Sequence, residues 1–207
     1  MISRLIQRAL SKHDYEEWTY WNKRQDPNVA AGWDPDFLKS SIDYIRRHTE
    51  NCDSVLELGP GVGRTLDAYS KECDIRAYDI SQLYREKLLA KVQTLGLKLQ
   101  LDLAQVPGED LPYGDRQFEA GVASQVFLHQ RPQNIEHMMR EMIRVCEKVV
   151  VITGGYGRAP RRADHVFGHD YPTLCARLGC EMHHVRAQPP QLFFVYAKSL
   201  SEFRSHI

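Results

Sequence analysis

The sequence has no excess of charge of either sign, no long hydrophobic run and no regular cysteine pattern. Basic and acidic residues number 27 each, so the formal net charge is zero, and we expect no nucleic-acid partner because such proteins usually carry a basic excess. No stretch of about 18 apolar residues occurs, and the first residues lack the apolar centre of a leader. The five cysteines form no CxxC pair, which argues against a disulfide framework or a zinc knuckle. These absences predict a soluble, cytoplasmic protein without a membrane partner.

From residue 53 onward, short apolar runs alternate with helical patterns, which is typical of a parallel α/β sheet. The clearest helix follows Pro132 and carries a methionine stripe at helical spacing, which we interpret as core packing. We expect a seven-stranded, mostly parallel sheet with helices on both faces, closed by an antiparallel pair. The expected strands are 54–58, 75–78, 97–103, 118–123, 148–152, 181–186 and 192–197, and the other expected helices are 64–69, 81–92 and 171–178.

Residues 1–50 differ in character, and we expect them to form a helical cap over a domain of residues 51–207. All three tryptophans of the chain lie there, and Asp34-Pro35 is a typical helix start. Fifty residues seldom bury enough surface to fold alone, so we expect these helices to lie on the sheet. The tryptophans favour two interpretations equally, a lid over a ligand or a hydrophobic anchor.

A glycine turn follows the first expected strand directly and is the strongest local signal. It reads Gly59-Pro60-Gly61-Val62-Gly63, and Asp79 ends the next strand twenty positions after the first glycine. Glycines allow the backbone to approach a ligand, and a carboxylate at that place can accept hydrogen bonds from a ribose diol. A dinucleotide fold would need a small residue where Arg64 stands, and Glu57 would repel a pyrophosphate. S-adenosylmethionine (SAM) has no phosphate, so the turn favours SAM over a nicotinamide dinucleotide.

Glu57-Leu58-Gly59-Pro60-Gly61-Val62-Gly63 resembles motif I of the class I SAM-dependent methyltransferases. The resemblance covers residues 52–198 and continues through three further segments, which are 78–81, 109–113 and 118–129 with the helix 141–145. It implies a Rossmann-like methyltransferase fold and a cofactor site for SAM. The cofactor-binding residues that it implies are Glu57, Gly59, Pro60, Gly61, Gly63, Asp79, Ile80, Glu109, Asp110, Leu111, Ser124 and Gln125. Three positions depart from the family pattern: Pro107 replaces its usual aspartate, Glu119 follows Phe118, and no L-K-P-G-G turn follows Val145.

The methyl acceptor is less clearly marked than the cofactor. His129 follows the fourth expected strand, at the edge where ligands bind, and is the best candidate for a general base, the alternative being a loop histidine bonded to backbone. Trp21, Trp33, Tyr156 and Arg158 are candidates for acceptor contact, the last two in a basic loop that is otherwise a solvated surface. His165 and His169 have no third ligand at regular spacing, so we expect no metal.

Signatures of nucleic-acid and arginine methyltransferases are missing, so a small-molecule acceptor remains, methylated on O, N or C. Two other functions stay open. The first is a methyltransferase-like binding or scaffold protein without turnover, and the second is an NAD(P)-dependent oxidoreductase. The sequence leaves the oligomeric state open.

Overall fold

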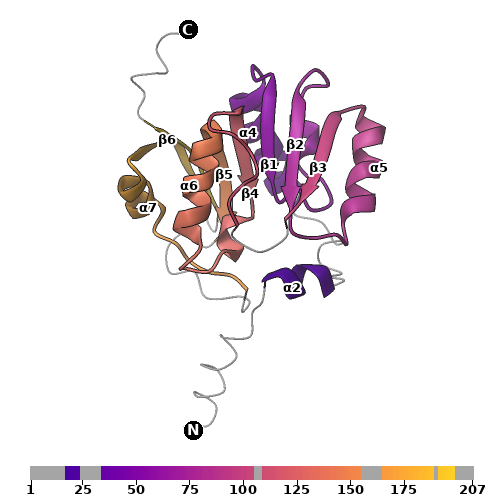
Figure 1. Ribbon diagram of the computed structural model, residues 1–207. Helices are drawn as coiled ribbons and strands as arrows, with labels where there is room; N and C mark the ends of the chain where they lie inside the picture. The colour runs from indigo at the N-terminus through magenta and orange to yellow at the C-terminus, as the bar shows by residue number, and fades with distance from the viewer. Residues whose placement is uncertain (1–16, 24–33, 105–108, 155–164, 189–190, 199–207) are drawn as a thin grey trace.

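The computed structural model describes residues 17–23, 34–104, 109–154, 165–188 and 191–198, which contain one seven-stranded sheet (Figure 1). Its strands are β1 (Ser54–Leu58), β2 (Asp74–Asp79), β3 (Lys98–Leu103), β4 (Phe118–Ser124), β5 (Cys146–Gly154), β6 (Cys180–Gln188) and β7 (Gln191–Lys198). The described helices are α2 (Glu17–Lys23), α4 (Pro35–Thr49), α5 (Arg85–Leu95), α6 (Ile135–Val145) and α7 (Tyr171–Leu178), with short 3-10 turns η2 (Leu66–Ala68) and η3 (Phe127–His129).

The strand order is β3-β2-β1-β4-β5-β7-β6, and β7 runs antiparallel to both of its neighbours. The other neighbouring pairs are parallel, which confirms the expected mostly parallel sheet and its closing antiparallel pair. The chain reverses its winding direction between β1 and β4. In such sheets the carboxyl edge at this switch point is where ligands bind.

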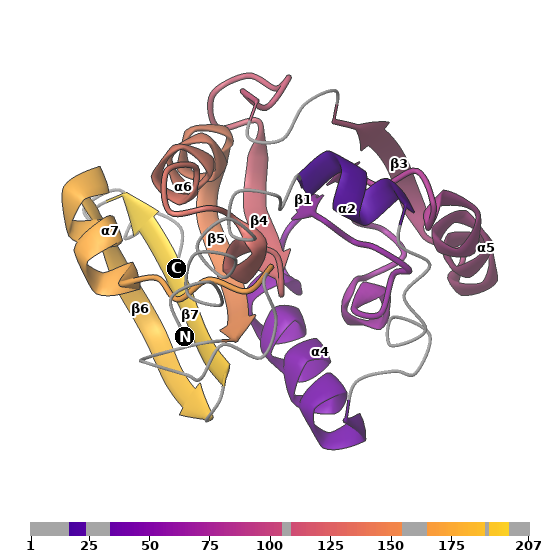
Figure 2. The ribbon, with the colours of Figure 1, turned by 90° about the horizontal axis from the view of Figure 1, so that it is seen from below.

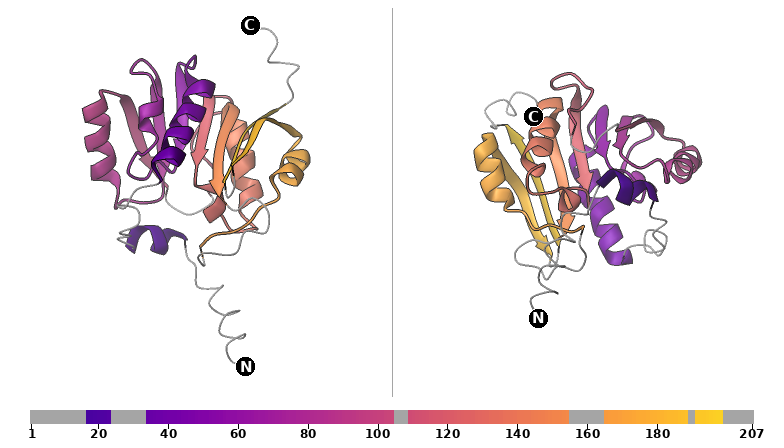
Figure 3. Two further views of the ribbon diagram at one scale, coloured as in Figure 1. Left: turned by 180° about the vertical axis from the view of Figure 1, so that it is seen from behind. Right: turned by 60° about the horizontal axis from the view of Figure 1, so that its bottom comes forward.

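Helices cover both faces of the sheet (Figures 2 and 3). On one face α4 and α5 bury Tyr44, Ile45, Leu88 and Val92 in a cluster with the strands. On the other face lie α6 and α7. α4 belongs to the predicted cap but packs as a full layer of the core, whereas α2 lies beyond the edge at which the parallel strands end (Figure 1).

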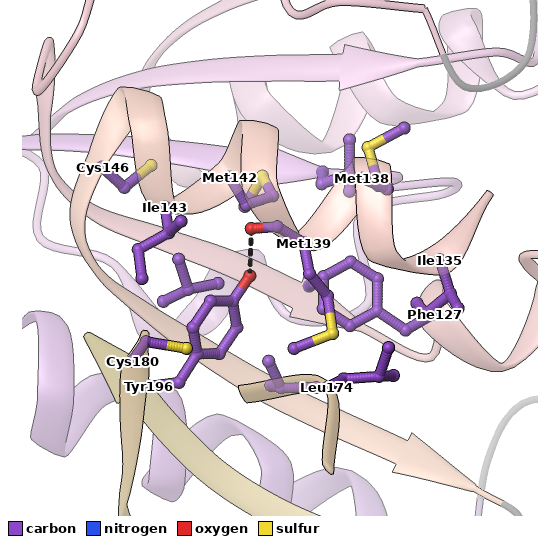
Figure 4. Packing of buried hydrophobic residues seen from close by; sticks show 14 of the residues in the cluster. Phe127, Ile135, Met138, Met139, Met142, Ile143, Cys146, Leu174, Cys180 and Tyr196 are labelled. Carbon is purple, nitrogen blue, oxygen red and sulfur yellow. Dashed lines mark hydrogen bonds between the residues drawn. The ribbon is translucent and has the colours of Figure 1, made fainter. Parts of the chain in front are cut away.

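The methionine stripe of α6 packs into the core, as its spacing predicts. Met138, Met139 and Met142 are at most 5% exposed. The Tyr196 hydroxyl of β7 donates to the main-chain oxygen of Met139 at 3.1 Å (Figure 4). The stripe is therefore structural, because its side chains fill the space between helix and sheet.

Two expected helices differ from the structure. The α-helix predicted over 64–69 is wrong, since only the 3-10 turn η2 forms there. Gly63 has a φ of +76°, which delays the start of any helix, and the chain must return to β2 by Asp74. The helix predicted to begin at Ser81 begins at Arg85, because residues 81–84 form a turn against α2. Within the described ranges no helix is long and apolar enough to cross a bilayer.

Candidate functional site

The glycine turn between β1 and η2 has two packed glycines and one open glycine. Gly59, Gly61 and Gly63 all have φ between +54° and +76°, a region that disfavours side chains. A Cβ on Gly59 would lie 2.6 Å from Val126 Cγ2, and one on Gly63 would lie 2.8 Å from Leu66 Cδ1. A Cβ on Gly61 would meet nothing within 4 Å. The outer glycines are thus required by packing, whereas Gly61 faces open space at the carboxyl edge.

Asp79 lies beside this open space at the end of β2. Its Oδ2 accepts from the Gly61 amide at 2.9 Å, and its Oδ1 accepts from the Ser81 amide at 2.8 Å. Burial raises the pKa of the Asp79 carboxyl, although these amides oppose the shift. The carboxylate therefore ties the glycine turn to the turn after β2, and with the Ile80 amide as a third donor it keeps acceptor capacity for about one further hydrogen bond.

Glu57 lies under the glycine turn. It is 1% exposed, and its Oε1 accepts from the Thr65 hydroxyl at 2.7 Å. Its Oε2 is buried and has no hydrogen-bond partner among the described residues. Burial raises the pKa of this carboxyl. Glu57 supports the turn from below, and its predicted cofactor contact stays a prediction.

The segment 109–115 is held against α6 by one arginine. The Arg144 guanidinium donates to the main-chain oxygens of Leu111 (2.9 Å) and Tyr113 (2.8 Å) and pairs with Glu141 at 2.7 Å. Glu141 Oε2 in turn accepts from the Leu111 amide at 2.9 Å. The E-x-x-R pair that contributes to the family resemblance therefore acts here as a clamp on backbone.

The predicted cofactor residues of this segment point in different directions. The Glu109 carboxylate accepts a hydrogen bond from the Tyr78 hydroxyl, and Leu111 is buried. The exposed Asp110 instead pairs with His137 of α6 at 3.1 Å. A groove of about 630 Å³ lies over β2 and β3, and its lining residues are Arg76, Tyr78, Asp102, Leu103, Glu109, Asp110, Pro112, Tyr113 and Gln117.

The end of β4 holds two polar side chains with unused capacity. Gln125 has a φ of +57°, which is unusual for a residue with a side chain, and its main-chain N–H donates to the main-chain oxygen of Ile152 at 2.6 Å. Ser124 Oγ and Gln125 Nε2 are both buried without a hydrogen-bond partner among the described residues. Strained backbone and unpaired buried polar atoms are features that gather at functional sites.

His129 is a neutral histidine with a defined tautomer. Its Nδ1 lies 2.9 Å from the main-chain oxygen of His165, and since a carbonyl only accepts, Nδ1 carries the proton and Nε2 has the lone pair. The two imidazole rings stack with centroids 5.1 Å apart. Burial lowers the pKa of His129 to about 4. The side chain is thus a hydrogen-bond acceptor at neutral pH.

α2 reaches the same edge of the sheet from far away in the sequence (Figure 2). The Trp21 ring lies edge-on to His129 with centroids 4.9 Å apart, and the Tyr20 hydroxyl lies 2.8 Å from His165 Nδ1. Asn22 bonds to the turn after β2. Sequence patterns did not identify Tyr20 or Asn22, because their partners are 58 or more residues away.

The carboxyl edge therefore brings together Gly59–Gly63, Asp79, Ile80, Ser124, Gln125, His129 and Trp21. Trp33, Tyr156 and Arg158 lie outside the described residues. Among the residues that the structure describes, no group of three or more His, Cys, Asp or Glu side chains could hold a metal ion.

Comparisons with known proteins relate this chain to a family and to a fold. Residues 55–148 match a family described as a methyltransferase domain. A relative from Cereibacter sphaeroides, named phosphatidylethanolamine N-methyltransferase, is 33% identical over 134 residues, which cover 62% of this chain. The chain spans 65% of that relative's length.

Two solved structures share the fold. A 1,6-didemethyltoxoflavin-N1-methyltransferase of Burkholderia thailandensis, with bound 1,6-didemethyltoxoflavin and S-adenosylhomocysteine, has a TM-score of 0.69 at 14% identity. That similarity covers 93% of this chain and 89% of the other. A magnesium protoporphyrin IX methyltransferase of Synechocystis has a TM-score of 0.63 at 10% identity, over 79% of this chain and 83% of the other. At these identities the likeness concerns the fold alone.

Proposed function

We propose that this chain is a class I SAM-dependent methyltransferase that transfers a methyl group from SAM to a small-molecule acceptor. One observation carries the proposal. The open face of Gly61 lies beside the Asp79 carboxylate at the switch point of the sheet. A Cβ at position 61 would fill this cradle, so glycine is the residue that lets a ligand approach the backbone closely here.

The residues at the cradle fit SAM better than a dinucleotide. Asp79 has acceptor capacity left for a ribose diol, and Ser124 and Gln125 offer polar atoms at the end of β4. The buried Glu57 under the turn offers no positive charge to a pyrophosphate, whereas an acidic side chain is compatible with the positive sulfonium and amino groups of SAM. These contacts support SAM as the cofactor of this chain.

The chain's own residues would mainly position the reactants. SAM supplies an activated methyl group on a good leaving group, so in-line placement of the acceptor provides most of the rate. His129 can orient an acceptor N–H or O–H through the lone pair on Nε2. Its low pKa makes it a weak base, so its role would be to orient the acceptor by a hydrogen bond rather than to take its proton. Trp21 covers His129 and excludes water from that side.

Within the small-molecule class, a lipid amine is the first acceptor to test. The activity named for the Cereibacter relative, at 33% identity, favours it over a hydroxyl or carbon acceptor. We infer that the headgroup amine would lie under α2, near His129. A scaffold without turnover remains the alternative function.

Isothermal titration with S-adenosylhomocysteine, NAD and NADP tests the cofactor. We expect micromolar binding of S-adenosylhomocysteine by the wild type and a large loss in Asp79→Ala; binding of NAD or NADP alone would refute the proposal. Transfer of radiolabelled methyl to phosphatidylethanolamine vesicles, compared with soluble amines and phenols, then tests the acceptor. Cofactor binding without turnover on any acceptor of this panel would favour the scaffold alternative.

A further inference from the structure

α2 is tied to the turn after β2 by three hydrogen bonds. Asn22 Nδ2 donates to Ile80 O at 2.9 Å, and Asn22 Oδ1 accepts from the Gln82 amide at 2.9 Å. The Ser81 hydroxyl donates to the main-chain oxygen of Trp21 at 2.8 Å. One amide side chain therefore brackets a three-residue turn, and the helix backbone holds its middle residue.

The same turn fixes the carboxylate of Asp79. The Ser81 amide donates to Asp79 Oδ1, and the other carboxylate oxygen accepts from the Gly61 amide. Ser81 is only 4% exposed, so water does not readily replace these partners. A continuous hydrogen-bonded path thus runs from Asn22 through the turn and Asp79 to the open glycine.

We propose that Asn22 is a positioning residue that orients Asp79 toward the cofactor ribose. This inference rests on the proposed function, because it assigns a ribose to the Asp79 carboxylate. Asn22 acts through the turn and through Asp79. An amide suits the position because it donates to a carbonyl and accepts from an amide at once. A carboxylate at position 22 would oppose the Ile80 oxygen with a second acceptor.

The loss of Asn22 should affect binding more than folding. Asn22 is half-buried and Gln82 is exposed, so water can reach the main-chain groups that the substitution releases. The turn then loses its fixed position, and part of the binding free energy is spent on ordering it again. We expect the dissociation constant of S-adenosylhomocysteine to rise about ten-fold.

Calorimetric titration of the full chain with S-adenosylhomocysteine tests the proposal. The variants are Asn22→Ala, the nearly isosteric Asn22→Asp, and Lys23→Ala as a control at the neighbouring exposed position of the same helix. Both Asn22 variants should bind about ten-fold more weakly, with the Tm of the ligand-free protein within about 3 °C of the wild type. The control should bind as the wild type does.

A double-mutant cycle separates positioning from a merely structural role. In an Asp79→Asn background, Asn22→Ala should weaken binding less than about two-fold, because its effect passes through that carboxylate. Unchanged affinity in both Asn22 variants, full additivity in the cycle, or a fall in ligand-free Tm with unchanged affinity would each overturn the inference. Failure of the wild type to bind S-adenosylhomocysteine would instead refute the proposed function.

Discussion

Alanine substitutions at two glycines of the same turn should separate ligand binding from folding. Gly61 and Gly63 have φ of +54° and +76°, so alanine at either costs about 1–2 kcal/mol of backbone strain. At Gly63 the new Cβ would also lie 2.8 Å from Leu66 Cδ1 and 2.9 Å from Leu88 Cδ1. Both leucines are at most 1% exposed and cannot yield easily, so overpacking adds about 1–3 kcal/mol.

Gly61→Ala should therefore lower the free energy of unfolding by about 1–2 kcal/mol, and Gly63→Ala by about 2–5 kcal/mol. For cofactor binding we expect the opposite order, with Gly61→Ala the more damaging of the two variants, since its methyl group enters the open space that we assign to the cofactor. We expect its affinity for S-adenosylhomocysteine to fall by about ten-fold or more, a loss of about 1.4 kcal/mol. Urea unfolding and calorimetric titration measure the two effects.

Two outcomes would refute this reasoning. If Gly61→Ala destabilises the protein as much as Gly63→Ala, the space around Gly61 is not open in solution. If Gly61→Ala binds S-adenosylhomocysteine with wild-type affinity, the open space is not where the cofactor lies.

Three further predictions concern charged and titratable groups. Arg144→Met should lower the free energy of unfolding, measured in urea, by about 2–4 kcal/mol, because the main-chain oxygens of 109–115 lose their donor. The control Arg140→Met breaks an exposed ion pair and should lower it by under about 1 kcal/mol. Equal losses in the two variants would refute the clamp. The pKa of His129 is lowered to about 4, so the unfolded chain binds more protons below pH 6.5, and stability should fall from pH 6.5 toward 4. His129→Gln should flatten that part of the stability profile, and an unchanged profile would contradict the assignment. The pKa of Glu57 is raised by burial, so the native state keeps the proton to a higher pH than the unfolded chain, and stability declines as the pH rises above 4.5. Glu57→Gln should therefore gain more stability relative to the wild type at pH 8 than at pH 5. Equal gains at the two pH values would contradict the raised pKa.

The sheet and the glycine turn could be predicted because their signals are local. The span predicted for β1, 54–58, is the one observed, since a short apolar run ends directly in a glycine. The α-helix predicted after the turn does not form, because Gly63 adopts a left-handed backbone conformation that the hydrophobic pattern does not indicate. Alternation alone does not reveal such a conformation.

The contacts that α2 makes over the site could not be predicted in the same way. Asn22 is one polar residue in a short helix, and its meaning depends on a turn about sixty residues away. Tyr20 meets His165 across 145 positions. The sequence did indicate Trp21 as a candidate contact, because the aromatic N-terminal segment could form a lid over a ligand, with a hydrophobic anchor as the alternative. The chemistry at the end of β4 was foreseen only as a family resemblance, and the φ of Gln125 appears in the structure alone.

The clamp made by Arg144 has a consequence for local opening of the folded protein. The described part of the connection between β3 and β4, residues 104 and 109–117, contains no helix, and polar bonds to one guanidinium fasten much of it. Leu111 is buried in the core and Tyr113 packs against it, whereas residues 114–117 are exposed. Exposed segments with few apolar contacts open at a lower free energy than the core. Amide protons of 114–117 should therefore exchange through local opening, while those of β1 and β4 exchange only through global unfolding. Inserted residues would disturb the sheet least in this exposed run, because no side chain of 114–117 is buried in the core.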